Sequence, residues 1–362
     1  MLFDSITAGK LKLSNRIVMA PMTRSRADPG NIPNALMAHY YSQRADAGLI
    51  VTEGTSPSPN GLGYARIPGL FNAEQVKGWK LVTDAVHDKG GKIVVQLMHT
   101  GRVTHSANLP VGAEVLGPCE AICPGEMFTD TMGMQPYSAP RPMTTQDIQK
   151  TVREYANSAK LALDAGFDGI ELHAANGYLI EQFLSPHVNV RTDEYGVNIA
   201  GRNRFALDVV NATVKAIGAG RVGIRLSPHG VFNGTGVYAG VDAQYLTLVQ
   251  ELSRLGLLYI HVLDHSSMGT PPVPAELKQS LREAFNGTFI LAGGFDAASA
   301  DLALTENQAD LIAFGRSFLA NPDLVNRMRG SKALNAPDMT TFYTPGAKGY
   351  TDYPALVDQE YV

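Results

Sequence analysis

The chain is poor in cysteine, and this excludes several ways of holding a fold together. Its 362 residues include only two cysteines, Cys119 and Cys123. A disulfide framework is therefore excluded as the basis of the fold. The pair also lacks the second cysteine or histidine pair of a zinc site and the four thiolates of an iron–sulfur cluster. We expect two ordinary thiols in a loop and no bound metal.

Long apolar runs, basic clusters and a leader sequence are also missing. No stretch approaches the roughly 18 consecutive apolar residues of a membrane-spanning helix, and residues 1–6 do not resemble the start of a signal peptide. The net charge is −4 at pH 7 and no basic stripe appears, which argues against nucleic acid as a partner. We therefore expect a soluble cytoplasmic protein.

Short apolar runs alternate with helical patterns along the chain. The runs are nearly continuous rather than alternating, which is typical of strands buried on both faces. They lie at about 16–19, 49–52, 93–97, 169–172, 222–226, 259–263, 289–291 and 311–314. The helical patterns between them include 35–47, 73–89, 145–165, 202–217 and 243–255.

Strand–helix alternation allows either a doubly wound sheet or a closed barrel, and the count of eight favours the (β/α)8 TIM barrel. A doubly wound dinucleotide fold would also need G-x-G-x-x-G after an early strand. The nearest stretch, Gly234-Thr-Gly236, has the wrong spacing. We predict one barrel domain over residues 1–362. Pro and Gly recur at about 99–142, which predicts a long capping loop after strand three.

Catalytic groups of such barrels cluster where the strands end. Small residues and one arginine follow the last two strands, where this fold commonly holds a phosphate: Gly293, Gly294, Gly315 and Arg316. Tight turns alone could also explain the glycines.

Arg225 lies inside an apolar strand and therefore needs an acceptor. The acceptor could be a core carboxylate or the electron-rich edge of a ligand such as a flavin. Gln96 and Thr23 could hydrogen-bond the same ring.

His173, Asn176 and Tyr178 form the most informative cluster, at the end of the fourth strand. Two adjacent donors could hold one oxygen of a substrate, and the phenol could deliver a proton. A lone tyrosine would more often be packing, but its two neighbours favour function.

Several other residues are expected to have structural rather than functional roles. His261 and His265 lack a third metal ligand. Arg24 and Arg26 are expected in a solvated or ion-paired loop, and Trp79 on the buried face of a helix.

Longer motifs run along nearly the whole chain. They include 15–24 (NRIVMAPMTR), 48–54 (GLIVTEG), 96–102 (QLMHTGR), 166–173 (GFDGIELH), 176–179 (NGYL), 191–196 (RTDEYG), 313–316 (AFGR) and 349–354 (GYTDYP). Together they resemble the Old Yellow Enzyme family of FMN-dependent ene reductases. Within that family they resemble the bacterial branch of pentaerythritol tetranitrate, N-ethylmaleimide and xenobiotic reductases.

The resemblance implies a non-covalent FMN, reduced by NADPH or by NADH, and a role for each matching residue. Those that would line the flavin ring are Pro21, Met22, Thr23, Gly54, Gln96 and Arg225. Those that would bind its phosphate are Gly293, Gly294, Gly315 and Arg316. Those that would contact the substrate are His173, Asn176, Tyr178, Tyr64, Met98 and Tyr343.

The implied reaction is reduction of the C=C bond of α,β-unsaturated carbonyl or nitro compounds, with nitrate esters as a further class. Hydride would pass from flavin N5 to Cβ, and Tyr178 would protonate Cα while His173 and Asn176 hold the carbonyl or nitro oxygen. The partner would be a small electrophilic alkene or nitro compound, and the protein a monomer or small homo-oligomer. Met98 replaces a tryptophan that is usual in this branch, which predicts an enlarged substrate cavity. The segment 197–204 lacks the branch's usual glutamate.

Two alternatives stay open. A flavin-free barrel lyase or isomerase would need a strand-end lysine or metal-binding carboxylates, and Glu53, Glu171 and Asp264 lack metal spacing. A flavin-binding module without catalysis would not need a proton donor such as Tyr178.

Replacement of the phenol tests the implied reaction. Tyr178→Phe is expected to slow the oxidative half-reaction with enones and to spare flavin reduction. The reason is that only the reduction of the enone needs a proton from Tyr178. Stopped-flow absorbance measures the two half-reactions separately. An equal loss in both would contradict this role.

Overall fold

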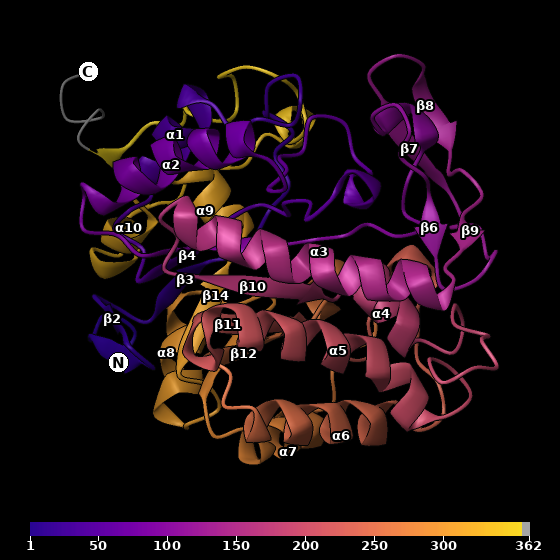
Figure 1. Ribbon diagram of the computed structural model, residues 1–362. Helices are drawn as coiled ribbons and strands as arrows, with labels where there is room; N and C mark the ends of the chain where they lie inside the picture. The colour runs from indigo at the N-terminus through magenta and orange to yellow at the C-terminus, as the bar shows by residue number, and fades with distance from the viewer. Residues whose placement is uncertain (357–362) are drawn as a thin grey trace.

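The computed structural model describes residues 1–356 and contains a closed barrel of eight parallel strands. Around the ring the order is β10, β11, β12, β13, β14, β3, β4 and β5. Their bounds are β3 (Ile17–Met19), β4 (Leu49–Val51), β5 (Ile93–Leu97), β10 (Gly169–Ala174), β11 (Val222–Leu226), β12 (Tyr259–Leu263), β13 (Thr288–Ala292) and β14 (Leu311–Phe314). Figure 1 shows long helices packed around this ring.

Every residue of these eight strands is buried. One face of each strand fills the barrel and the other lies under the helices, which explains the continuous apolar runs in the sequence. The predicted (β/α)8 fold is confirmed, and each predicted run overlaps one barrel strand. The prediction of one domain over residues 1–362 extends to 357–362, which lie outside the described residues.

The longer helices, α2, α3, α5, α6 and α7, are amphipathic covers for the strands. Trp79 is fully buried on α2, as predicted. The helices are α1 (Ala35–Ser42), α2 (Ala73–His87), α3 (Thr145–Asp164), α4 (Leu179–Leu184), α5 (Ile199–Ile217), α6 (Val241–Arg254), α7 (Ala275–Ala284), α8 (Ala297–Thr305), α9 (Arg316–Ala320) and α10 (Leu324–Arg329). Within residues 1–356, none is both long enough and apolar enough to cross a bilayer.

A short hairpin covers the end of the barrel at which the strands begin. β1 (Ile6–Ala8) and β2 (Leu11–Leu13) pair antiparallel. Ala8 and Leu13 share an apolar cluster with Leu258 and Tyr259, at the start of β12. The opposite end of the barrel is therefore the one left for a site.

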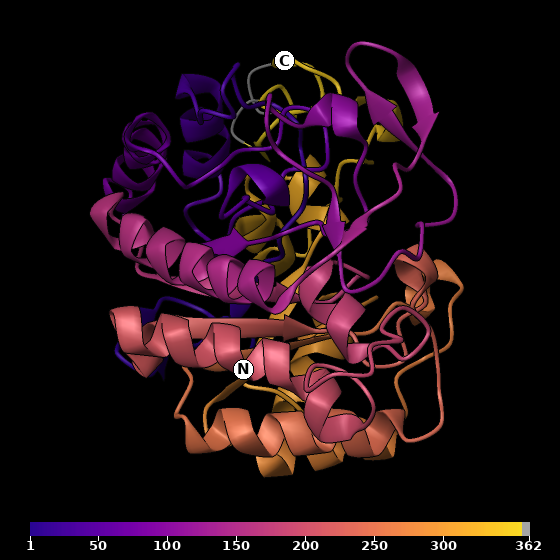
Figure 2. The same cartoon turned by 45° about the vertical axis from the view of Figure 1, so that its right-hand side comes forward.

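The predicted capping segment at 99–142 does follow β5, but it contains strands that the sequence pattern missed. β6 (Leu116–Gly117) pairs with β9 (Arg141–Pro142), and β7 (Glu126–Thr129) pairs with β8 (Gly133–Pro136). Figures 1 and 2 show the β7–β8 hairpin projecting from the rest of the molecule. Strands of two to four residues are too short to show a hydrophobic period.

The expectation that Arg24 and Arg26 lie in a solvated or ion-paired loop is wrong, because both side chains are buried. Arg24 Nη2 donates to the Gly349 carbonyl at 2.7 Å. Arg26 donates from Nη2 to the Thr341 carbonyl at 2.8 Å and from Nη1 to the Phe342 carbonyl at 2.7 Å. Main-chain carbonyls of the C-terminal segment thus replace water around the two guanidinium groups. In Figure 1 this yellow segment lies above the indigo N-terminal part of the chain.

Removal of one guanidinium group tests whether these hydrogen bonds hold the C-terminal segment in place. We expect Arg26→Ala to lower the free energy of unfolding by about 2–4 kcal/mol, because several buried carbonyls lose their donor. Trypsin is expected to cleave faster at the exposed Lys348. Arg204→Ala is the matched control, since that half-exposed side chain pairs with the half-exposed Glu194. Equal denaturation curves for the two variants would contradict the proposed stabilisation of the C-terminal segment by Arg26.

Candidate active site

A cavity of about 620 Å³ opens at the end of the barrel where the strands finish, a size that suits a cofactor or a drug-sized ligand. Many of the residues predicted from the sequence line it: Pro21, Met22, Tyr64, Asn176, Tyr178, Arg225, Gly293, Gly294, Gly315 and Arg316. They come from both ends of the chain and from its middle, and barrel closure brings them together.

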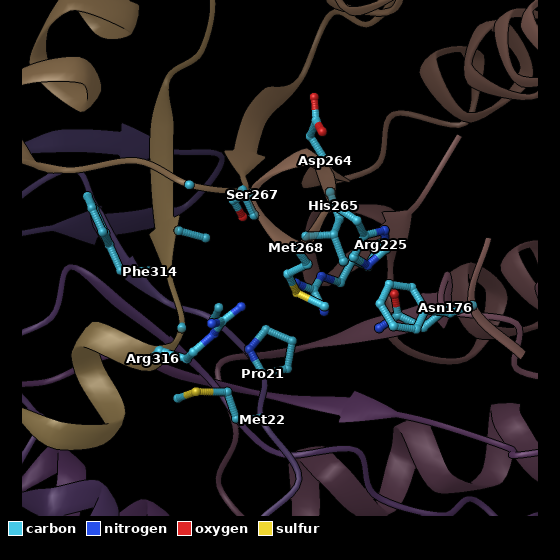
Figure 3. Close-up of a pocket in the computed structure, with 18 of the residues that line it drawn as sticks. Pro21, Met22, Asn176, Arg225, Asp264, His265, Ser267, Met268, Phe314 and Arg316 are labelled. Atoms are coloured by element: carbon cyan, nitrogen blue, oxygen red, sulfur yellow. The ribbon is translucent and has the colours of Figure 1, made fainter. Parts of the chain in front are cut away.

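One side of the cavity combines small residues with positive charge. Gly293 and Gly294 have φ angles of 127° and 72°, which glycine adopts without strain. Arg316 stands beside Pro21 on this side, whereas Arg225 lies across the cavity (Figure 3). The glycine backbone and the Arg316 guanidinium can hold a phosphate group here.

A layer of buried polar side chains crosses the barrel below the cavity. Glu171 Oε1 accepts from Gln96 Nε2 at 2.8 Å, and Glu171 Oε2 lies 2.9 Å from His261 Nδ1. Burial alone would raise the pKa of Glu171, but His261 and Arg225 outweigh it and hold that pKa below its ordinary value. The Arg225 side chain reaches the cavity wall, and its Nε has no hydrogen-bond partner within residues 1–356. Because Arg225 lines the cavity, its guanidinium group can donate to a ligand bound there.

The predicted catalytic cluster is assembled where β10 ends. The rings of His173 and Tyr178 meet edge to face with centroids 4.8 Å apart. The Tyr178 hydroxyl lies 3.0 Å from the Tyr64 hydroxyl. Asn176 has a φ of 60°, and its buried Oδ1 has no partner among the described residues. The three residues therefore lie next to one another at the end of β10, and Asn176 and Tyr178 line the cavity.

Burial sets the protonation of this cluster. It lowers the pKa of His173 well below its usual range, and the neighbouring charge of Arg225 adds to the effect. The Ala175 N–H donates to His173 Nδ1 at 3.3 Å, so the neutral ring carries its proton on Nε2. Burial raises the pKa of Tyr178 to about 12. Both side chains are thus neutral proton carriers near neutral pH.

The remaining predicted residues lie behind or beside the cavity wall. They are Thr23, Gly54, Gln96, Met98, His173 and Tyr343. Met98 is buried against Leu62 and Ile67, and a Cβ on Gly54 would come within 2.5 Å of its sulfur. Met98 therefore packs against Gly54 and is not among the residues that line the cavity. The effect of this residue on cavity size stays a prediction. The Tyr343 side chain is 61% exposed.

Part of the cavity wall was not predicted from the sequence. Phe232 and Asn233 line the cavity, and Asn233 Nδ2 donates to the Asn176 carbonyl at 2.7 Å. The Asn-Gly pair at 233–234, shortly after a strand, was the available signal for a loop at the barrel mouth. His265 also lines the wall, and burial, with help from Arg225, lowers its pKa to about 4. Within residues 1–356, no group of acidic, histidine and cysteine side chains is arranged to hold a metal ion.

Comparison with known proteins agrees with this geometry. A profile of the NADH:flavin oxidoreductase / NADH oxidase family matches residues 1–335. The chain belongs to that family. Its barrel superposes on morphinone reductase with a TM-score of 0.95, at 43% identity over 99% of this chain and 97% of that one. For the Old Yellow Enzyme homologue of Zymomonas mobilis the TM-score is 0.93, at 38% identity over 98% and 99% of the two chains.

Relatives known by sequence extend the same picture. The chain is 42% identical to 12-oxophytodienoate reductase 1 of Oryza sativa subsp. japonica, over 97% of this chain and 93% of the relative. It is 40% identical to a probable flavin mononucleotide-dependent alkene reductase of Leishmania infantum, over 98% of both proteins. This chain is an FMN-dependent oxidoreductase of the Old Yellow Enzyme family, as the sequence motifs predicted.

The buried imidazole gives a pH prediction. Because the folded pKa of His173 is lowered, its ring stays neutral where free histidine is already half protonated. The NMR signal of its ring Cε1–H, assigned by its loss in His173→Asn, is expected not to shift between about pH 8 and pH 6. Histidine added to the sample is the internal control. Titration of the two signals together would contradict the predicted neutral ring.

Proposed function

We propose that this chain binds FMN non-covalently in the described cavity and reduces the C=C bond of α,β-unsaturated carbonyl or nitro compounds, using NADPH or NADH. The observation that carries the proposal is the cavity itself. Its wall joins a phosphate-sized cradle at Gly293, Gly294 and Arg316 to Arg225 and Asn176, whose Nε and Oδ1 atoms have no partner among the described residues. Buried polar atoms without partners are costly in a finished fold and are expected where a ligand supplies the missing bonds.

The residues around the ring of the cofactor would be held in place by the polar layer. Pro21 and Met22 would contact its face, with Thr23 and Gly54 nearby. Gln96 Nε2 donates to Glu171, which orients the amide so that its oxygen can accept from a ring N–H. Arg225 would donate to the electron-rich pyrimidine edge. Bound FMN supplies the hydride chemistry, and the protein supplies position and electrostatics.

The residues above the ring would act on the substrate. His173 Nε2–H and the Asn176 amide would donate to the carbonyl or nitro oxygen and stabilise the negative charge that develops on it. Tyr178 would deliver a proton to Cα, and its raised pKa keeps it protonated until it is needed. The Tyr64 hydroxyl, 3.0 Å away, can accept from or donate to the Tyr178 oxygen as that proton moves.

Tyr343, in the C-terminal segment, is proposed to border the substrate. Met98, which packs in the same apolar cluster as Tyr178, is proposed to border it as well. Nitrate esters are proposed as a further substrate class, since the same donors suit a nitro oxygen. Preference for NADPH, a cytoplasmic location and a monomeric or small homo-oligomeric state stay predictions.

Visible absorbance of the purified protein under anaerobic conditions tests the proposal. The protein is expected to be yellow, to bleach on addition of NADPH and to recover its colour on addition of 2-cyclohexenone. A colourless protein that cannot be reconstituted with FMN would overturn the proposed function. Bleaching without recovery by enones, maleimides or nitroalkenes would refute the substrate class and keep the flavin.

A further inference from the structure

The turn between β10 and α4 has a backbone conformation that needs support. Asn176 and Gly177 both have left-handed φ angles, 60° and 75°. Such a conformation is strained for a residue with a side chain. A Cβ at Gly177 would lie 2.6 Å from the Phe232 carbonyl oxygen, so only glycine fits there. The turn carries Asn176 and Tyr178 on its two sides, and both line the cavity.

A single buried carboxyl group is linked to both backbone amides of this turn, to one directly and to the other through a hydroxyl. Glu181, on α4, is 3% exposed. Its Oε2 accepts from the Gly177 N–H at 2.5 Å, and its Oε1 accepts from the Ser227 hydroxyl at 2.8 Å. The Ser227 oxygen in turn accepts from the Asn176 N–H at 3.0 Å. Glu181 therefore fixes Gly177 directly and Asn176 through one hydroxyl.

The groups packed around Glu181 are donors rather than cations. Tyr245 of α6 donates its hydroxyl to Oε1 at 2.9 Å. Tyr238 and His229 share a small cavity with the carboxyl, and His229 Nε2 lies 2.6 Å from the exposed carboxyl of Asp242. No ion pair joins Glu181 to a basic side chain among residues 1–356. Burial accordingly raises the pKa of Glu181 to about 7.

Burial of a carboxyl group without a neighbouring cation lowers the free energy of unfolding, and an apolar side chain of similar volume would give a more stable fold. The hydrogen bonds that Glu181 makes suggest why a carboxyl group is present at this position. All of the bonds on Oε2, and one of the two on Oε1, lead to the turn that carries Asn176 and Tyr178.

We propose that Glu181 is a positioning residue, which acts through Gly177 and Ser227 to hold Asn176 and Tyr178 in their working geometry. The inference rests on the proposed function, because it concerns the same reaction. Glu181 itself is not among the residues that line the cavity. Its contribution is geometric, and displacement of a catalytic group by about 1 Å can cost on the order of a hundredfold in rate.

Two replacements of Glu181 in the FMN-loaded enzyme test the proposal. Glu181→Leu removes both acceptor oxygens at similar volume, whereas Glu181→Gln keeps one oxygen for the Gly177 N–H. Stopped-flow absorbance gives the limiting rates of flavin bleaching by NADPH and of recovery with 2-cyclohexenone. We expect Glu181→Leu to lower both limiting rates about tenfold or more with FMN content unchanged, because Asn176 would also help to seat the nicotinamide during flavin reduction. Glu181→Gln is expected to recover most of the loss.

Tyr238→Phe is the matched control. Its hydroxyl borders the same small cavity but donates to the Leu184 carbonyl and not to Glu181. We expect this variant to keep wild-type rates. A folded Glu181→Leu variant with rates within about twofold of wild type would overturn the proposal. An equal loss in the Leu and Gln variants that parallels a fall in FMN content or melting temperature would also overturn it.

Ser227→Ala keeps the proposal testable if Glu181→Leu does not fold. This change removes only the link from the carboxylate to Asn176, so both rates are expected to fall by several fold. Unchanged rates would overturn the relay through Ser227. A wild-type protein that does not bleach and recover would count against the proposed function. A working wild type with unaffected Ser227 and Glu181 variants would count against the positioning role alone.

Discussion

Closure of the barrel is the constraint on which the rest of the structure depends. β14 pairs with β3 in parallel, which sets Phe314 beside Met19. Because all eight strands run in one direction, their ends meet at a single rim. The segment after β3, with Met22, therefore shares a cavity with Arg316 after β14. Without that pairing the two halves of the site would belong to opposite ends of an open sheet.

The interior of the barrel departs from a purely apolar core, and it does so directly below the cavity. Gln96 and His261 both hydrogen-bond to Glu171 from different strands, while His261 Nε2 and Arg225 Nε lack partners among the described residues. Local rules of packing are expected to fail at functional sites, where preorganised polar groups must await a ligand. Burial removes water from the cluster above this layer, which lowers the pKa of His173 and raises that of Tyr178, so both side chains are held neutral.

Sequence patterns predicted the framework well and its long-range contacts poorly. Runs such as 93–97 and 222–226 coincide with β5 and β11 because strands buried on both faces need continuous apolar residues. Arg24 was misplaced in solvent because its acceptor, the Gly349 carbonyl, belongs to a segment far along the chain. The wall residue Asn233 was missed because its neighbour, Asn176, arrives from another βα loop.

The sequence by itself determined the eight-strand barrel, the family and the residue types available at the strand ends, since periodicity and motifs are local properties. Only the tertiary structure decided which of those residues share the cavity wall and which lie behind it. Gln96 and Arg225 both lie on barrel strands, yet the Gln96 amide nitrogen is bonded to Glu171 whereas Arg225 lines the cavity. That difference arises from strand register and burial, which depend on every strand in the closed ring.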